Sequence, residues 1–183
     1  HIPLQSGDER ILKAMGRPIT SGDYRKLIER IRTSISGVAI TTDVIAGFPG
    51  ETQQNFQTTK DFVSKLAFAG GHVFTYSPRP GTSAFKMKER VPVQLAKARN
   101  AELREIFLDS GREFRNRFLG EEMKVLWETA NQTEDGSWRV SGLTDNYLRV
   151  YADSVDNLWN QISMVRIRAD LPSKGALRGC ISS

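Results

Sequence analysis

The sequence predicts an α/β protein in which parallel strand–helix units are followed by a small antiparallel β-barrel. Strand and helix patterns alternate three times within residues 1–117, whereas from residue 118 onward short alternating strands follow one another with no helix between them. Three strand–helix units are too few to close a parallel barrel. We therefore expect two domains, 1–117 and 118–183, of which the first is the carboxy-terminal part of a larger barrel.

The elements of the first domain are predicted from apolar spacing and from the Gly and Pro residues that separate the segments. A β-branched run around Val38 to Ala46 indicates a buried strand, and apolar positions at helical spacing from Pro92 onward indicate a long amphipathic helix. The expected strands are 1–4, 38–46 and 72–76, and the expected helices are 8–15, 22–34, 52–66 and 92–117.

The second domain is predicted from short runs of alternating apolar residues between turn residues. The expected strands are 123–127, 137–141, 147–151 and 162–167. Short strands without intervening helices are typical of a small barrel of the oligonucleotide-binding kind.

Composition sets limits on the class of protein. Apolar residues make up 39% of the 183 residues and charged residues 26%, which is ordinary for a chain that buries a core. No apolar run approaches the roughly 18 residues of a membrane helix, so we expect a cytoplasmic protein without a membrane partner. The only cysteine is Cys180, which excludes an internal disulfide and a thiolate metal site built from this chain alone. Because the sequence starts directly on an apolar, strand-like segment, we treat it as a fragment.

Positive charge is concentrated in the first domain. Residues 1–117 hold 19 Lys/Arg and 12 Asp/Glu, whereas residues 118–183 hold 7 and 9. The excess is densest over residues 86–117, where nine basic residues meet five acidic ones. A basic helix of this kind is either a nucleic-acid contact or a solvated helix face.

Functional groups of parallel α/β proteins gather where strands end, at the carboxyl edge of the sheet. This rule selects two positions after the first expected strand, two within the second and two after the third. The positions are Gln5 and Ser6, Asp43 and Ile45, and Ser77 and Arg79.

Four segments, in order, resemble the radical S-adenosylmethionine methylthiotransferase family. They read HIPLQSG (1–7), MGR (15–17), TDVIAGFPGET (42–52) and YSPRPGTSA (76–84). The resemblance implies that residues 1–117 are the carboxy-terminal half of a partial (β/α)6, TIM-like radical-SAM barrel and that residues 118–183 are the OB-like TRAM barrel of this family. Many family members have serine where this chain has Asp8, a departure in the first loop.

The resemblance also implies roles for five residues around S-adenosylmethionine. Gln5 would contact the methionine or ribose part, and Arg17 its carboxylate. Asp43 would accept hydrogen bonds from the ribose hydroxyls, Ile45 would pack on adenine, and the backbone at Ser77 would read the adenine edge. These assignments suit the chemistry, since guanidinium matches a carboxylate and a carboxylate accepts from a diol.

Each of these residues also has an ordinary structural interpretation. The alternatives are a helix cap for Gln5, an exposed position for Arg17, burial with a backbone partner for Asp43 and core packing for Ile45. An unpaired buried carboxylate costs several kcal/mol, which makes a purely structural Asp43 the hardest to accept. We expect the two histidines, His1 and His72, to be non-catalytic.

The reaction implied by the resemblance inserts a methylthio group into a carbon–hydrogen bond. A 4Fe-4S cluster held by C-x-x-x-C-x-x-C cleaves S-adenosylmethionine to a radical, and a second 4Fe-4S cluster is implicated in sulfur delivery. None of those cysteines is present, so we expect the fragment alone to be inactive. The three-cysteine motif should lie about four strand-lengths upstream of His1; an open reading frame beginning at His1 would contradict this.

The TRAM resemblance implies tRNA as the partner of a monomeric enzyme. Candidate RNA contacts are Arg139, Arg149, Arg166 and Arg168. Stacking surfaces for bases are expected among the aromatic residues, although strand alternation places most of these in the core. The aromatic residues are Trp127, Trp138, Tyr147, Tyr151 and Trp159.

The substrate stays open within the family. The target is an adenosine beside the anticodon that carries an isopentenyl or a threonylcarbamoyl group, or an aspartate of a ribosomal protein. Residues 146–150, NYLRV, resemble the threonylcarbamoyl branch. Two other classes remain: a non-catalytic RNA-binding protein, and a different barrel enzyme that uses residues 47–50 as a phosphate loop.

Overall fold

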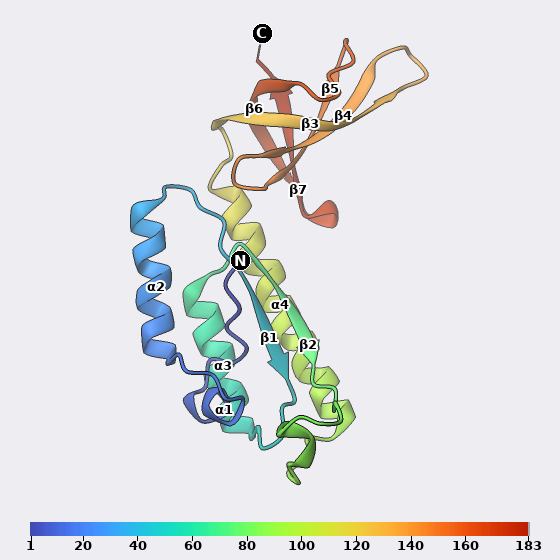
Figure 1. Ribbon diagram of the computed structural model, residues 1–183. Helices are drawn as coiled ribbons and strands as arrows, with labels where there is room; N and C mark the ends of the chain where they lie inside the picture. The colour runs from blue at the N-terminus through green and yellow to red at the C-terminus, as the bar shows by residue number, and fades with distance from the viewer. Residues whose placement is uncertain (183) are drawn as a thin grey trace. The chain divides into compact units, whose positions relative to one another are not determined.

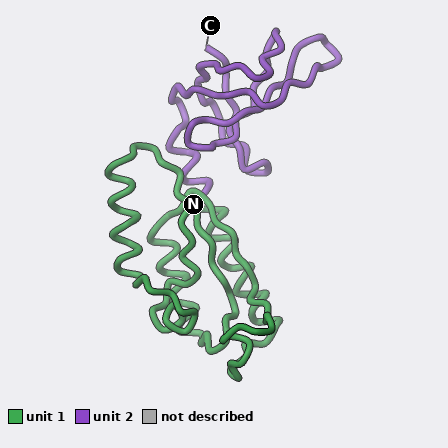
Figure 2. Tube along the Cα trace, viewed as in Figure 1, with its two compact units in different colours: residues 1–110 green, residues 111–183 purple. Residues whose placement is uncertain are grey.

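The computed structural model describes residues 1–182 and divides the chain into two compact units, His1–Ser110 and Gly111–Ser183 (Figure 2). The division falls inside a long helix whose final turns belong to the second unit. The domain boundary that we expect after Arg117 stays a prediction.

The first unit alternates helices with two parallel strands (Figure 1). Its predicted helices are all present with small shifts at their ends. The elements are α1 (Glu9–Ala14), α2 (Ser21–Ser34), β1 (Thr41–Ala46), α3 (Gln53–Leu66), β2 (Gly70–Thr75), a single 3-10 turn η1 (Ala84–Lys86) and α4 (Val93–Asn116).

Three helices of this unit begin at side-chain caps. Asp8, Thr20 and Thr52 each accept a hydrogen bond from the backbone N–H three residues further on. At α3 the cap is reciprocal, because the Asn55 side chain accepts from the Thr52 N–H. Such caps satisfy backbone donors that a helix start otherwise leaves unpaired, and they fix where each loop ends.

The sheet of the first unit consists of β1 and β2 in parallel register, with Asp43 opposite His72 and Ile45 opposite Phe74. The strand expected at residues 1–4 is reduced to one bridge between Gln5 and Val44. Its backbone still runs along β1, since Ile2 N donates to Thr41 O and Ile45 N donates to Gln5 O. The segment therefore occupies a strand position without a full ladder.

The two faces of β1 differ in burial. Thr42, Val44 and Ala46 are buried, whereas Asp43 and Ile45 on the opposite face are not. Side chains alternate across a strand, so one face belongs to the core and the other is left open. The core on the buried face draws on α2, α3 and α4 and consists of Leu4, Tyr24, Ile28, Ile40, Val44, Ala46, Phe56, Val63, Leu66, Phe68, Leu103 and Phe107.

The second unit is a closed five-stranded barrel with strand order β3-β4-β5-β7-β6. Four of its strands were predicted, with shifted ends. The fifth, β7, was not predicted, and it pairs in parallel with β5 while every other pair is antiparallel. The elements are β3 (Glu122–Gln132), β4 (Trp138–Thr144), β5 (Arg149–Ser154), β6 (Ile162–Leu171), a 3-10 turn η2 (Pro172–Lys174) and β7 (Ala176–Ile181).

Burial separates the aromatic residues of the barrel into two groups. Trp127 is completely buried, and its Nε1 donates to Ser163 Oγ at 3.1 Å, so it is a core residue. Tyr147 and Trp159 lie on loops and are 80% and 64% exposed. These two loop residues are therefore the aromatic surfaces most available for stacking.

Among the described residues, no helix is both long and apolar enough to cross a membrane.

Candidate functional site

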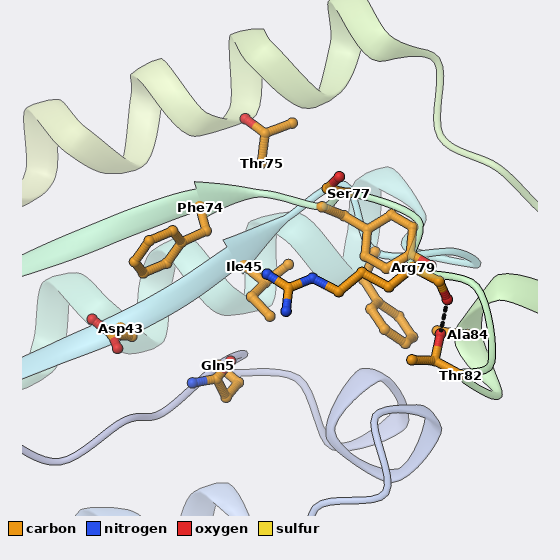
Figure 3. Close-up of a pocket in the computed structure, with 11 residues that line it drawn as sticks. Gln5, Asp43, Ile45, Phe74, Thr75, Ser77, Arg79, Thr82 and Ala84 are labelled. Carbon is orange, nitrogen blue, oxygen red and sulfur yellow. Dashed lines mark hydrogen bonds between the residues drawn. The ribbon is translucent and has the colours of Figure 1, made fainter.

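A cavity of about 450 Å³ opens on the face of the sheet that the helices leave uncovered (Figure 3). Its volume falls within the range of small-molecule sites. The cavity lies at the carboxyl ends of β1 and β2, where the strand-end rule places functional groups. It is lined by Gln5, Asp43, Ile45, Phe48, Phe74, Thr75, Tyr76, Ser77, Arg79, Thr82 and Ala84.

The structure brings four of the five predicted cofactor residues together. Gln5, Asp43, Ile45 and Ser77 all line the cavity, although they come from three separate segments of the chain. Arg17 does not line it; this residue is exposed, just after α1. The geometry therefore brings four of the assigned residues into one cavity, and the roles of all five stay predictions.

Gln5 has an unusual backbone conformation, with φ of 71°. This left-handed region is uncommon for a side chain other than Gly, Asn or Asp, and residues held in it cluster at functional sites. Backbone hydrogen bonds hold it on both sides, because Gln5 N donates to Asp43 O and Gln5 O accepts from Ile45 N. Gln5 does not cap the following helix, since Asp8 fills that position.

The carboxylate of Asp43 lies between two imidazole rings. Its Oδ2 is 3.2 Å from His1 Nε2, and its Oδ1 is 3.3 Å from His72 Nδ1. Its partners are thus side chains rather than the backbone groups of the structural alternative. At 23% exposure the carboxylate remains accessible from the cavity side.

An apolar surface follows Asp43 along the sheet. Ile45 and Phe74 are register neighbours on β1 and β2, and both side chains point into the cavity (Figure 3). Phe74 is 53% exposed despite its size. Phe48 and Tyr76 extend the apolar lining as an edge-on pair with ring centroids 5.3 Å apart. Apolar walls of this kind accept the face of a planar ring.

The far wall of the cavity carries free backbone groups and one cation. Among the described residues, the N–H and C=O of Ser77 have no hydrogen-bond partner, and neither does the Arg79 guanidinium. Figure 3 shows the Arg79 side chain extending across the cavity beside Ile45. The strand-end rule selected Arg79, but we assigned it no role; its direction depends on a loop closed by Thr82 Oγ1, which donates to Arg79 O at 2.8 Å.

A buried ion pair between Glu51 and Arg99 holds the loop after β1 in place. Glu51 Oε1 accepts from Gly47 N at 3.0 Å and from Arg99 NH1 at 2.7 Å, and Arg99 also donates to Glu51 O. Burial raises the pKa of Glu51, while the Gly47 N–H and Arg99 partly oppose that rise. The ion pair connects the loop after β1 to α4. The glycine and proline residues of this loop form the turn that positions Phe48.

Three of the four arginines predicted to contact RNA already form ion pairs. Arg139 is 3.7 Å from Asp153, and the corresponding distances are 2.6 Å for Arg149 with Glu128 and 3.1 Å for Arg166 with Glu122. Arg168 is exposed and has no ion-pair partner in the described part of the chain. Of these four side chains, Arg168 is the readiest phosphate contact.

The described residues contain no group of three or more His, Cys, Asp or Glu that could hold a metal ion. Cys180 is exposed on β7 and is a single thiol. An iron–sulfur cluster needs several thiolate ligands, so the residues of this chain do not fit one.

Parallel strand–helix units are typical of a segment of a parallel α/β barrel, and the cavity on the open sheet face has the volume and the partly apolar lining of a small-molecule site. The family description "Radical SAM superfamily" matches residues 1–63, a range that includes Gln5, Asp43 and Ile45.

Curated relatives extend the match over most of the chain. A tRNA-2-methylthio-N(6)-dimethylallyladenosine synthase of Acetivibrio thermocellus is 42% identical over 135 residues, covering 74% of this chain and 28% of the relative. A threonylcarbamoyladenosine tRNA methylthiotransferase of Thermotoga maritima is 37% identical over 172 residues, 92% of this chain and 38% of the relative. A dimethylallyladenosine synthase of Cereibacter sphaeroides is 35% identical over 173 residues.

Along most of its length the chain is similar to radical-SAM tRNA methylthiotransferases. It spans 28% to 39% of the length of the three relatives.

Proposed function

We propose that the protein to which this chain belongs adds a methylthio group to a modified adenosine beside the anticodon of tRNA. The observation that carries the proposal is the cavity in which Gln5, Asp43, Ile45 and Ser77 converge from segments matching this family. The names of relatives acting on dimethylallyladenosine and on threonylcarbamoyladenosine support both substrates as candidates.

The cavity residues fit the adenosine part of S-adenosylmethionine. A carboxylate with open lone pairs suits a ribose diol, and the apolar surface of Ile45 and Phe74 suits a purine face. The unpaired backbone groups of Ser77 suit the donor and acceptor edge of adenine. Once bound beside a reduced cluster, S-adenosylmethionine supplies the radical chemistry, while this chain orients its nucleoside half.

We place the cluster ligands in the part of the protein outside these 183 residues. The single cysteine of the chain and the share of each relative that it covers support that placement. We assign the second unit as the TRAM barrel that contacts tRNA, with Arg168, Tyr147 and Trp159 as its exposed candidates.

The test is nucleoside analysis of tRNA treated with the full gene product. The protein, with its clusters reconstituted without oxygen, is incubated with S-adenosylmethionine, a reductant and tRNA carrying either modified adenosine. We expect mass spectrometry to detect one methylthio group replacing one hydrogen on one of the two nucleosides. The Asp43→Ala variant should yield little product and bind S-adenosylmethionine weakly.

Other outcomes separate the alternatives. Methylthiolation of a ribosomal-protein aspartate, with tRNA unmodified, would move the enzyme to the protein-modifying branch. Tight tRNA binding with no S-adenosylmethionine cleavage would favour a non-catalytic RNA-binding protein and contradict the proposal.

A further inference from the structure

The histidines on either side of Asp43 form a defined hydrogen-bond arrangement. A carboxylate only accepts, so a ring nitrogen that is hydrogen-bonded to it must donate. His72 therefore donates from Nδ1 to Oδ1, and His1 places its Nε2 3.2 Å from Oδ2 as an ion-pair contact. The two rings thus use different nitrogens, one for each carboxylate oxygen.

The second nitrogen of His1 also has a partner. His1 Nδ1 is 2.9 Å from Thr41 Oγ1 on the same open face of β1. When Nε2 carries the proton, the neutral ring accepts at Nδ1 from the Thr41 hydroxyl. Thr41 thereby orients the ring that contacts Asp43.

Fixing both oxygens determines the plane of the carboxylate. Each oxygen has about two acceptor positions, and one imidazole nitrogen lies against each oxygen. One acceptor position per oxygen is left, which is the number that the two hydroxyls of a ribose diol require. We propose that His1 and His72 are positioning residues that orient the Asp43 carboxylate toward the ribose hydroxyls of S-adenosylmethionine, an inference that rests on the proposed function.

Stability alone does not account for this arrangement. The His1 and His72 side chains are 43% and 74% exposed, and exposed ion pairs add little to stability because water screens them. A role limited to fastening the amino-terminal segment would leave discrimination for the ribose hydroxyls unchanged, whereas a positioning role changes it.

Amide substitutions test which nitrogen matters. The side-chain N–H₂ of Asn takes the place of imidazole Nδ1, and that of Gln takes the place of Nε2. We expect His72→Asn and His1→Gln to retain affinity for S-adenosylmethionine. The crossed variants, His72→Gln and His1→Asn, should each bind roughly three- to tenfold more weakly, as expected for one lost hydrogen bond to a charged group. The measurement is isothermal titration calorimetry on the reconstituted full gene product.

A second readout isolates the ribose. Competition by adenosine and by 2′,3′-dideoxyadenosine measures how strongly the site discriminates for the hydroxyls. The crossed variants should lose much of this discrimination, and the matched variants should keep it. Thr41→Val should weaken binding when His1 is present but not in the His1→Gln background, where Thr41 has no imidazole ring to orient.

The outcomes distinguish this inference from the function on which it rests. The positioning role would be overturned if the Asn and Gln variants at each position bound S-adenosylmethionine with equal affinity and kept the native discrimination for the ribose hydroxyls. In that case a loss of S-adenosylmethionine binding in Asp43→Ala would still support the cofactor site. If Asp43→Ala binds S-adenosylmethionine like the native protein, the cofactor site itself is wrong. Equal thermal unfolding midpoints for the paired variants exclude misfolding as the cause of a difference.

Discussion

At the scale of residues, the sequence predicts which polar groups meet but not how they are held. Gln5 and Asp43 follow from the rule that functional groups sit at the carboxyl ends of strands. The positive φ of Gln5 and the imidazole partners of Asp43 depend on strand register, which a single sequence does not specify. The rule also selects Arg79, but not the direction of its side chain, which depends on the closure of the loop by Thr82.

The Glu51–Arg99 pair permits a prediction at the same scale. Arg99→Met leaves a buried carboxylate without its cation, and the expected loss is about 3–5 kcal/mol of local stability. Hydrogen exchange of the peptides that span the loop and α3 measures it. The double variant Glu51→Gln/Arg99→Met has no buried unpaired carboxylate, so it should recover much of the lost local stability.

The pH dependence of that variant follows from the raised pKa of Glu51. A carboxyl whose folded pKa exceeds its unfolded pKa stabilises the fold at low pH, and that contribution is lost as pH rises through the folded value. Without Arg99 the carboxylate loses a stabilising partner, so its pKa rises further. Arg99→Met should therefore be more destabilising near pH 8 than near pH 5; a loss independent of pH would contradict a buried charge as the cause.

At the scale of elements, regular hydrophobic patterns predicted the helices and most strands, whereas segments with irregular patterns were not predicted correctly. Residues 1–4 read as a strand, but only one bridge forms, because the Thr42 hydroxyl accepts from Leu4 N and donates to Ile2 O in place of backbone groups of β1. β7 was missed because Gly175 and Gly179 interrupt its pattern and its parallel pairing with β5 has no local signature. Pairing between strands that are distant in sequence depends on tertiary structure rather than on local sequence.

The contact between the loop after β1 and α4 leads to an element-scale prediction. Gly47 has φ of 77°, and a Cβ there would lie 2.4 Å from Ala96 Cβ. Gly47→Ala should cost about 1–3 kcal/mol through strain and overpacking, and should weaken S-adenosylmethionine binding by displacing Phe48.

Gly81→Ala is the matched control for this substitution. Gly81 has φ of 86°, with nothing within 4 Å of an added Cβ, so it carries the backbone strain without the clash. Hydrogen exchange of the loop should change more in Gly47→Ala than in Gly81→Ala, and adding Ala96→Gly should remove the difference. Equal effects of the two single substitutions would show that the clash with α4 is unimportant.

At the scale of the whole molecule, net charge is a poor guide to where RNA binds. The chain carries a formal charge of +5, but many arginines are already neutralised within their own unit. Arg99 is paired with Glu51, and Arg115 Nε donates to Asp170 Oδ1 at 2.7 Å. A charge count from the sequence treats these guanidinium groups as available, because both pairs join α4 to residues distant in sequence.

Salt dependence of tRNA binding tests this distinction. Arg168→Gln in the full gene product should reduce the slope of log Kd against log salt by about 1, the change expected for one lost phosphate contact. Arg139→Gln should change the slope less, because Asp153 already pairs with that guanidinium. Filter binding over a range of salt concentrations measures both, and equal slopes for the two variants would refute the assignment.

The strand order of the barrel also bears on how the protein folds during synthesis. β7 lies between β5 and β6, so neither of these strands has its final neighbour until the ribosome has released residues 176–181. Until then, β5 and β6 present unpaired edges, which are the sites where nascent chains aggregate or recruit chaperones. The barrel therefore completes its fold late, as a single step, after the helices and parallel strands of the first unit have emerged.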